Sequence, residues 1–226
     1  LWYEHSLGQE AYFELLADYR HEDEWASEGP VYDPVPVFPG RVIYDKGAWI
    51  LHTLRGRMGD GPFFGILQEW ASAGDRPHET VITQELIDLA SAWAGEPLDD
   101  FFWPYLEEIY LPQIVFDYEI GEGLAGEDTK LTVNLRQNQT RLFDNVYPLV
   151  VTTSSSVTTE RVSQDTRNKS VDYEYPEAIT QVELDPEQWV LWNEAGPEPE
   201  TSGLELVYPN PSRGGYVVFR YSLAQT

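Results

Sequence analysis

The stretch Tyr44-Asp45-Lys46-Gly47-Ala48-Trp49-Ile50-Leu51-His52-Thr53-Leu54-Arg55 decides how this chain folds, and it continues to Met58 and Gly59. Its apolar residues recur three and four positions apart: Ala48, Leu51, Leu54 and Met58. This spacing predicts a helix that is buried along one stripe. Gly59 is expected to end the helix, because glycine tolerates the backbone conformation that closes helices. Tyr44 is expected at or just before the first turn, where its hydroxyl can point into a cleft.

Further helices are predicted on both sides of this stretch. Helical spacing of apolar residues runs from Leu1 to about Tyr19, from Phe63 to Trp70, and from Thr83 to Trp93. Gly95 is expected to end the last of these helices. The segment from Glu24 to Gly40 is rich in proline and glycine, and each proline restricts the residue before it to extended conformations. An ordered loop is therefore predicted there.

After Pro112 the pattern changes to short alternating strands, rich in Val, Thr and Tyr and separated by Gly, Asn, Asp or Ser. The predicted strands are Ile114–Ile120, Lys130–Leu135, Val146–Thr152, Ser156–Val162 and Ala178–Leu184. Strands that follow one another at such short intervals predict a β-sandwich. The chain is therefore predicted to be α+β, with the helices first and the sandwich second.

Composition indicates a folded protein and excludes some partners. The 226 residues are 42% apolar and 14% aromatic, which is enough for a core in one large or two small domains. The 39 Asp and Glu residues exceed the 14 Lys and Arg residues, so the formal charge is −25. This charge argues against binding to nucleic acid or anionic membranes, because their phosphates would repel it. A solvated acidic surface explains the charge more simply than an acidic site.

Cysteine usage and the ends of the chain give further limits. The sequence has no cysteine, which excludes disulfides and thiolate metal sites within the chain. No apolar run is long enough to span a bilayer, and Leu1 to His5 lack the basic start and apolar core of a signal peptide. Because the sequence begins with leucine instead of an initiator methionine, we expect it to be an internal piece of a longer protein.

The motif Y-x-K-G-a at Tyr44 to Ala48 resembles a segment of the zinc aminopeptidase family that contains aminopeptidase N, a family of gluzincin metallopeptidases. The resemblance continues in the same order with G-D-x-x-F-F from Gly59, G-x-x-L-x-x-F-F-x-x-w-L from Gly95, and Leu111-Pro112. It implies the helical end of a thermolysin-like catalytic domain followed by an all-β sandwich domain. It also implies zinc as the cofactor, peptides as substrates, and hydrolysis of the N-terminal peptide bond.

By this resemblance, Tyr44 is the residue that stabilises the oxyanion of the tetrahedral intermediate. A phenol hydroxyl suits this role because it stays a neutral hydrogen-bond donor at neutral pH. The simpler alternative is that Tyr44 only packs and donates a hydrogen bond to a carbonyl group. The surrounding motifs favour the catalytic role, because context confirms a motif.

The third zinc ligand of the family is a glutamate on a helix of the type W-L-x-E-G-F-A-x-Y-x-E. Leu1-Trp2 and Tyr12-Phe13-Glu14 resemble the two ends of that helix, but the spacing between them differs. Alignment from the second end places Leu7 at the ligand position, whereas alignment from the first end places Glu4 and His5 near it. Glu4 and His5 are therefore alternative metal ligands, because carboxylate and imidazole both bind zinc. An equally simple alternative is a charged pair on a solvated turn.

The motif H-E-x-x-H, which supplies two ligands and the glutamate that activates water, is absent from the sequence. The histidines are His5, His21, His52 and His78. In the family this motif lies upstream of the third ligand, so we expect it before Leu1 in a longer protein. The chain alone is then incomplete and inactive. We expect His52, on the central helix, to be packed or at the surface.

The last part of the chain resembles the end of one domain and the start of another. Residues Val182 to Leu191 resemble the close of the family's small β-domain, where a structural role is expected. The Y-P-N-P-x-x-G motif at Tyr208 to Gly214 is similar to the start of a bacterial immunoglobulin-like or sorting domain. This predicts domains at 1–112, 113–193 and 204–226 with a linker at 194–203. It also predicts a secreted or cell-surface bacterial protein.

A second class of function fits the same sequence. The chain can belong to a catalytically inactive relative, in which the helices and the sandwich form a binding or scaffolding module. The broken third-ligand pattern around Leu7 supports this alternative. A third possibility, an acidic carbohydrate-binding sandwich with a helical spacer, leaves the match from Tyr44 to Asp60 unexplained.

Overall fold

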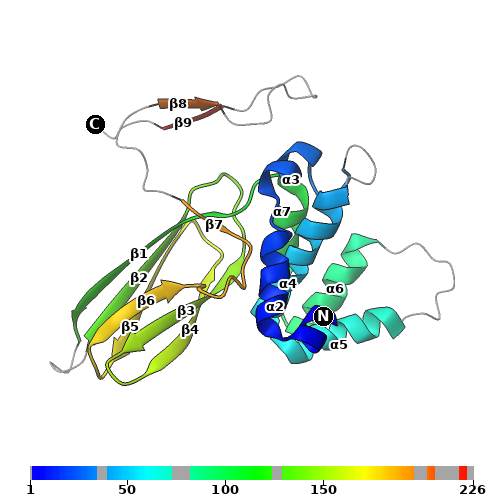
Figure 1. The fold of residues 1–226 in the computed structure, drawn as a ribbon. Helices are drawn as coiled ribbons and strands as arrows, with labels where there is room; N and C mark the ends of the chain where they lie inside the picture. Colours follow the sequence, from blue (N-terminus) through cyan, green and yellow to red (C-terminus); the bar gives the residue numbers. More distant parts are fainter. Residues whose placement is uncertain are drawn as a thin grey trace.

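The computed structural model describes residues 2–34, 40–72, 82–123, 129–195, 203–206 and 219–222. Helices come first and strands follow, so the predicted α+β class is confirmed (Figure 1). Most of the predicted linker at 194–203 and the motif from Tyr208 to Gly214 lie outside the described residues.

The helical part consists of seven α-helices and one π-helical turn within the described residues. They are α1 (Trp2–Leu7), α2 (Gln9–Asp18), α3 (Glu22–Glu28), η1 (Val42–Lys46), α4 (Gly47–Met58), α5 (Asp60–Ser72), α6 (Thr83–Ala94) and α7 (Asp99–Glu107). The predicted end of the central helix at Gly59 is confirmed, and its φ of 80° is a value that glycine adopts readily. The single helix expected up to Tyr19 is divided in two, because Gly8 has a φ of 92°.

Two predictions about the region before α4 were wrong. The predicted loop from Glu24 to Gly40 is wrong for residues 24–28, which belong to helix α3, because three acids in its first turn complement the helix dipole and Trp25 is buried. Residues 29–34 form neither helix nor strand. Tyr44 does not lie at or before a helix start. It lies inside a helical segment that begins at Gly40, in the π-helical turn η1.

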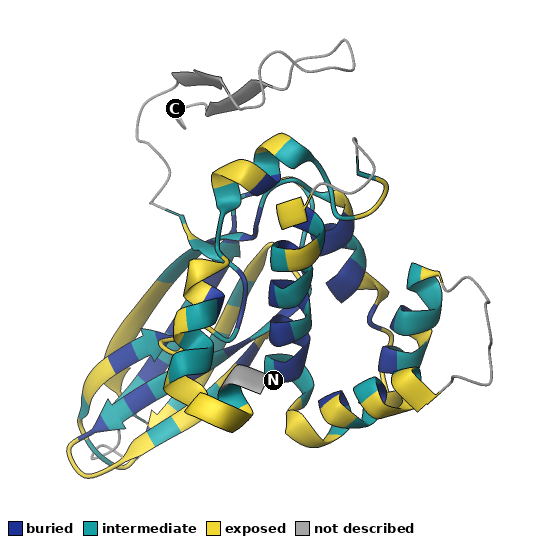
Figure 2. Cartoon of the chain, turned by 45° about the vertical axis from the view of Figure 1, so that its right-hand side comes forward, coloured by how far each residue is buried: buried dark blue, intermediate teal, exposed yellow. Residues whose placement is uncertain are grey.

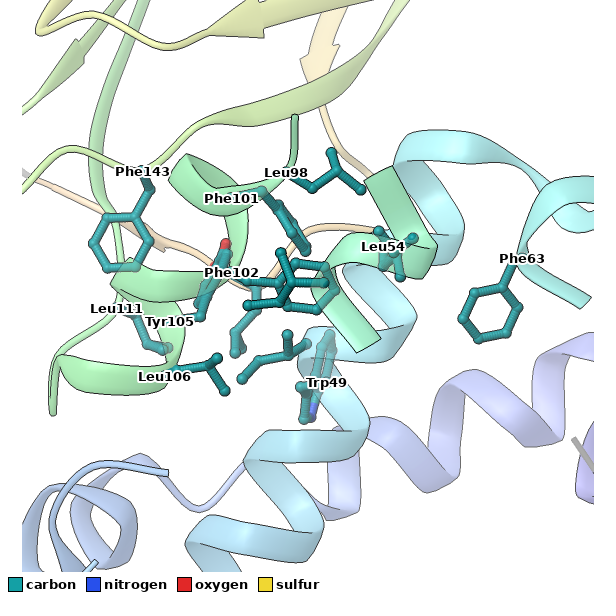
Figure 3. Packing of buried hydrophobic residues seen from close by; sticks show 14 of the residues in the cluster. Trp49, Leu54, Phe63, Leu98, Phe101, Phe102, Tyr105, Leu106, Leu111 and Phe143 are labelled. Carbon is teal, nitrogen blue, oxygen red and sulfur yellow. The ribbon is translucent and has the colours of Figure 1, made fainter. Parts of the chain in front are cut away.

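Helix α4 is the centre of the helical part, and every one of its residues is buried or half-buried (Figure 2). Aromatic and aliphatic side chains of α7 pack against its Trp49 and Leu54 (Figure 3). The residues that α7 contributes are Phe101, Phe102, Tyr105 and Leu106. Phe143, from the loop before β3, joins this cluster with its ring centroid 4.8 Å from that of Tyr105. The helical core therefore includes residues of the β part.

Strands β1 to β7 form two sheets that share one core. The strands are β1 (Gln113–Glu122), β2 (Thr129–Gln137), β3 (Asn145–Thr153), β4 (Val157–Gln164), β5 (Asn168–Tyr175), β6 (Ile179–Leu184), β7 (Asn193–Glu194), β8 (Gly203–Leu206) and β9 (Phe219–Ser222). Within the described residues, one sheet has the order β5-β2-β1-β7 and the other has the order β4-β3-β6. Alternate residues of both sheets point into a common apolar cluster, the arrangement of sheets packed face to face. Among the residues that the structure describes, strands β8 and β9 pair with each other and with no further strand.

A turn after β6 attaches the β part to α4. The carboxylate of Asp185 accepts hydrogen bonds from the backbone N–H groups of Trp189 and Val190, at 2.7 and 2.9 Å. This fixes the turn so that the N–H of Leu191 donates to the hydroxyl of Thr53 on α4, at 3.0 Å. Trp189 lies against Gly56 of α4, where an added Cβ would lie 3.1 Å from the Cβ of Trp189. Gly56 therefore allows the two parts to approach closely.

The contact at Gly56 leads to a stability prediction. We expect Gly56→Val to lower the free energy of unfolding by about 1–3 kcal/mol, because the added methyl groups overpack the contact with Trp189. Denaturant unfolding would measure the effect. Gly61→Val is the matched control, because a Cβ at Gly61 in α5 meets no atom within 4 Å. Equal unfolding midpoints for the two variants would contradict the role assigned to Gly56.

Candidate functional site

Tyr44 projects from the π-helical turn η1 toward solvent. Its side chain is 70% exposed, and it lines a pocket next to α4. Within the described part of the chain, no other residue hydrogen-bonds its hydroxyl. The simpler sequence-based alternative, a tyrosine that packs and donates to a carbonyl group, is therefore not what these residues show.

The turn that carries Tyr44 is held from both sides. The fully buried Lys46 donates from its Nζ to the backbone carbonyl of Glu108, at the end of α7, over 2.6 Å. The backbone N–H of Val42 donates to the carboxylate of Glu28 at 2.7 Å. Burial lowers the pKa of Lys46 to about 8, although the nearby Glu108 carboxylate opposes this shift. Residues two positions apart on a helix point in different directions, so the buried Lys46 leaves Tyr44 facing outward.

Local π-helical turns of this kind occur frequently at functional sites. Here the turn combines a fixed backbone with one outward-facing phenol. Such a group can donate a hydrogen bond to a bound molecule without first rearranging, which is what preorganised stabilisation of developing charge requires.

The pocket beside Tyr44 has a volume of about 510 Å³. The polar groups of its described lining side chains are the hydroxyls of Tyr44 and Thr83 and the indole N–H of Trp70, and the lining includes no charged side chain. The lining residues are Ile43, Tyr44, Gly47, Ala48, Ile50, Leu51, Trp70, Ile82, Thr83, Leu86, Ile87, Phe102 and Leu106. Helices α4, α6 and α7 thus provide most of its walls.

Glu4, one of the two candidate metal ligands, is bound by an arginine. Both of its carboxylate oxygens accept hydrogen bonds from Arg55, at 2.7 and 2.8 Å. Arg55 is only 4% exposed and also donates from Nε to Asp60 at 2.7 Å. The hydrogen bonds from Arg55 lower the pKa of Glu4, against the effect of burial. In this structure Glu4 therefore acts as the partner of a buried cation.

The structure does not bring the predicted site residues together. Glu4 contacts Arg55 near the end of α4, whereas Tyr44 lies eleven residues earlier in the same helical segment, roughly 16 Å away along the axis. His5 is exposed on α1 beside Glu4. The roles of Glu4 and His5 as metal ligands stay predictions.

The described residues do not form a zinc site by themselves. No group of three or more His, Cys, Asp or Glu side chains among them is placed to hold a metal ion. Zinc needs three or four such ligands. No chemical step is therefore assigned to a metal on the basis of these residues.

His52 lies in an aromatic cage where α2, α4 and the turn after β6 meet. Its Nδ1 is 2.9 Å from the Tyr12 hydroxyl and its Nε2 is 3.2 Å from the carbonyl oxygen of Gln188. Its ring stacks on Trp189 with centroids 4.9 Å apart. Of the two expected positions for His52, packed or at the surface, the packed one is confirmed. Burial lowers the pKa of His52 to about 4.

Arg55 and Lys46 organise this region, but no role was predicted for them from the sequence. Both are basic residues of the stretch from Tyr44 to Arg55 that forms η1 and most of α4. Arg55 follows the apolar Leu54 on a helix predicted to be buried, and such a buried arginine requires acidic partners. Its partners, Glu4 and Asp60, belong to other helices, so the spacing of residues did not reveal them.

Comparisons with known proteins support the fold. No family model matches the sequence, and no curated protein matches it. The structure is similar to part of aminopeptidase A of Legionella pneumophila, solved in complex with aspartic acid, with a TM-score of 0.57 and 14% sequence identity. The match covers 72% of this chain and 19% of the length of that enzyme. The chain therefore shares its fold with part of that enzyme and spans about a fifth of its length.

The Arg55 ion pair leads to a prediction about Glu4. We expect Glu4→Gln to lower the free energy of unfolding by about 2 kcal/mol, because it leaves the buried guanidinium with Asp60 as its remaining charged partner. Denaturant unfolding at neutral pH would measure the loss. Glu10→Gln is the control, because Glu10 is exposed on α2. A loss below about 0.5 kcal/mol, typical of a surface ion pair, would contradict the structural role of Glu4.

The buried His52 leads to a prediction about pH. Its pKa is about 6.5 when unperturbed and about 4 in the folded chain. Between these values the unfolded state binds a proton that the folded state does not, so stability falls as the pH falls. From pH 6.5 to pH 4, we expect the wild-type protein to lose about 3 kcal/mol more than His52→Gln in denaturant unfolding. His5→Gln, a change at an exposed histidine, should lose as much as the wild type. An equally steep loss in His52→Gln would disprove the assignment.

Proposed function

We propose that this chain is part of a zinc aminopeptidase that hydrolyses the N-terminal bond of peptides, and that Tyr44 hydrogen-bonds the oxyanion. The observation that supports this proposal is the outward-facing phenol of Tyr44, fixed by a buried turn at the rim of a pocket. The peptidase-like fold agrees with it.

The proposed step requires little of Tyr44 beyond its position. As the peptide carbonyl is attacked, its oxygen gains negative charge and accepts a stronger hydrogen bond from the phenol O–H. Because Lys46 and Val42 hold the turn, the donor is already in place and its reorganisation costs little free energy. The phenol keeps its proton throughout.

The sequence has no H-E-x-x-H motif, so the main metal ligands and the residues that recognise the amino group would have to come from outside this sequence. His5 and Glu4 remain the candidates for a further ligand from this chain. Of the two, His5 is the less committed, because both carboxylate oxygens of Glu4 are bound by Arg55.

A second candidate function is a catalytically inactive relative that serves as a binding or scaffolding module. The observation that favours it is the engagement of Glu4 by Arg55, at the opposite end of the helical segment from Tyr44. In such a relative, α1 would have kept its packing role and lost the metal.

A peptide is the proposed partner, and secretion or display on a bacterial cell surface is the proposed location. Among the described residues, no helix is both long and apolar enough to cross a bilayer.

The role of Tyr44 can be tested in a longer protein that carries this chain. We expect Tyr44→Phe to lower kcat by about a hundredfold or more with unchanged zinc content, because loss of one oxyanion donor typically costs about 3–4 kcal/mol. Steady-state kinetics and metal analysis would measure both quantities. Tyr19→Phe is the matched control, because it removes another exposed phenol from the helical part.

Near-normal turnover in Tyr44→Phe would disprove the catalytic role of this tyrosine. Absence of both bound zinc and turnover in the unaltered protein would instead favour the inactive relative. The two results therefore distinguish a wrong residue from a wrong class of function.

A further inference from the structure

We propose that the pocket beside Tyr44 binds a large apolar side chain next to the scissile bond, so that the preferred substrates are peptides with such a residue. This inference rests on the proposed function and adds the substrate class.

The chemistry of the lining supports an apolar occupant. The described lining offers aliphatic and aromatic side chains and no charged group. A carboxylate or ammonium group inside the pocket would lose its hydration and find no oppositely charged partner in the described lining, which is strongly unfavourable. The volume of about 510 Å³ also falls in the range of about 300–1,000 Å³ that is usual for small-molecule sites.

The exposure of side chains around the pocket supports the same conclusion. Ile82, on its rim, is 59% exposed and lies in the same lining as the 70% exposed Tyr44. Single exposed apolar residues are ordinary, but exposed apolar residues gathered around a hollow indicate a surface that binds something. Removing them from water would contribute to the affinity for an apolar side chain.

Gly47 has no side chain, and there is unoccupied space next to its Cα. It lines the pocket from the first position of α4, and a Cβ added there would meet no atom within 4 Å. A larger residue at this position would therefore project into open space without disturbing the fold.

Tyr44 connects the pocket to the proposed chemistry, because it contributes to the lining and its hydroxyl has no hydrogen-bond partner among the residues that the structure describes. A peptide carbonyl that accepts a hydrogen bond from this hydroxyl is at the edge of the pocket. The side chain of an adjoining residue is then within reach of the apolar walls.

Binding of amino acid amides to the 226-residue chain tests the proposal without relying on catalysis. The probes are L-phenylalanine amide, L-alanine amide and the α-amide of L-aspartic acid, and isothermal titration calorimetry would measure their affinities. We expect the phenylalanine amide to bind about tenfold or more tightly than the other two. An apolar pocket typically loses about tenfold or more in affinity when the ligand lacks an apolar group that would fill it.

The matched pair of variants is Gly47→Leu, which adds a side chain at a lining residue of the pocket, and Gly61→Leu, which adds the same side chain on α5 outside the pocket. We expect Gly47→Leu to reduce the preference for phenylalanine amide at least tenfold and Gly61→Leu to keep it within about twofold. Leu86→Gln, which makes another lining residue polar, is the second variant if Gly47→Leu does not fold. Unfolding midpoints would verify that each variant is folded.

Equal affinities for the three amides, or equal effects of the two leucine variants, would overturn the proposal. Failure of the catalytic assignment has a different signature. In that case the preference for phenylalanine amide and its loss in Gly47→Leu persist, while Tyr44→Phe has normal turnover in the longer protein.

Discussion

The arrangement of the helices depends on one buried cation. The guanidinium of Arg55 binds Glu4 of α1 and Asp60 of α5, and it lies 5.7, 5.1 and 5.7 Å from the ring centroids of Tyr12, Phe64 and Trp189. A charge this buried is stable only with such partners, since desolvation would otherwise dominate. One side chain thus fixes α1, α2, α5 and the turn after β6 around α4. The turn that carries Tyr44 is held separately, by the hydrogen bonds of Lys46 with Glu108 and of Val42 with Glu28.

Much of the fold was predictable from local patterns. The three-and-four spacing of Ala48, Leu51 and Leu54 located α4, and alternation located most strands, because both patterns depend on residues close in sequence. Strand β5 was missed because its inward phase begins with Lys169 and its outward positions are Asn, Ser, Asp and Glu. Strand β7 was missed because its two residues are defined by pairing with β1. Both depend on contacts distant in sequence.

The candidate site was predictable only in part. Tyr44 was found through its motif, and its exposed position in the structure is compatible with the role that the motif suggests. The ion pair of Glu4 was not visible, because 51 positions separate it from Arg55. The pocket was not visible either, since its walls come from separate helices and only packing brings them together. Which acids remain available to a metal is therefore a tertiary property that spacing does not encode.

The π-helical turn η1 has a consequence for comparisons between related sequences. Such a turn accommodates one more residue than an α-helical turn of the same height. A relative that lacks one residue between Val42 and Lys46 would form an ordinary α-helix there, and everything before the deletion would rotate by about 100° about the axis. The phenol would then face another direction. A one-residue gap in an alignment at this position would therefore separate chains that present the tyrosine to the pocket from chains that do not.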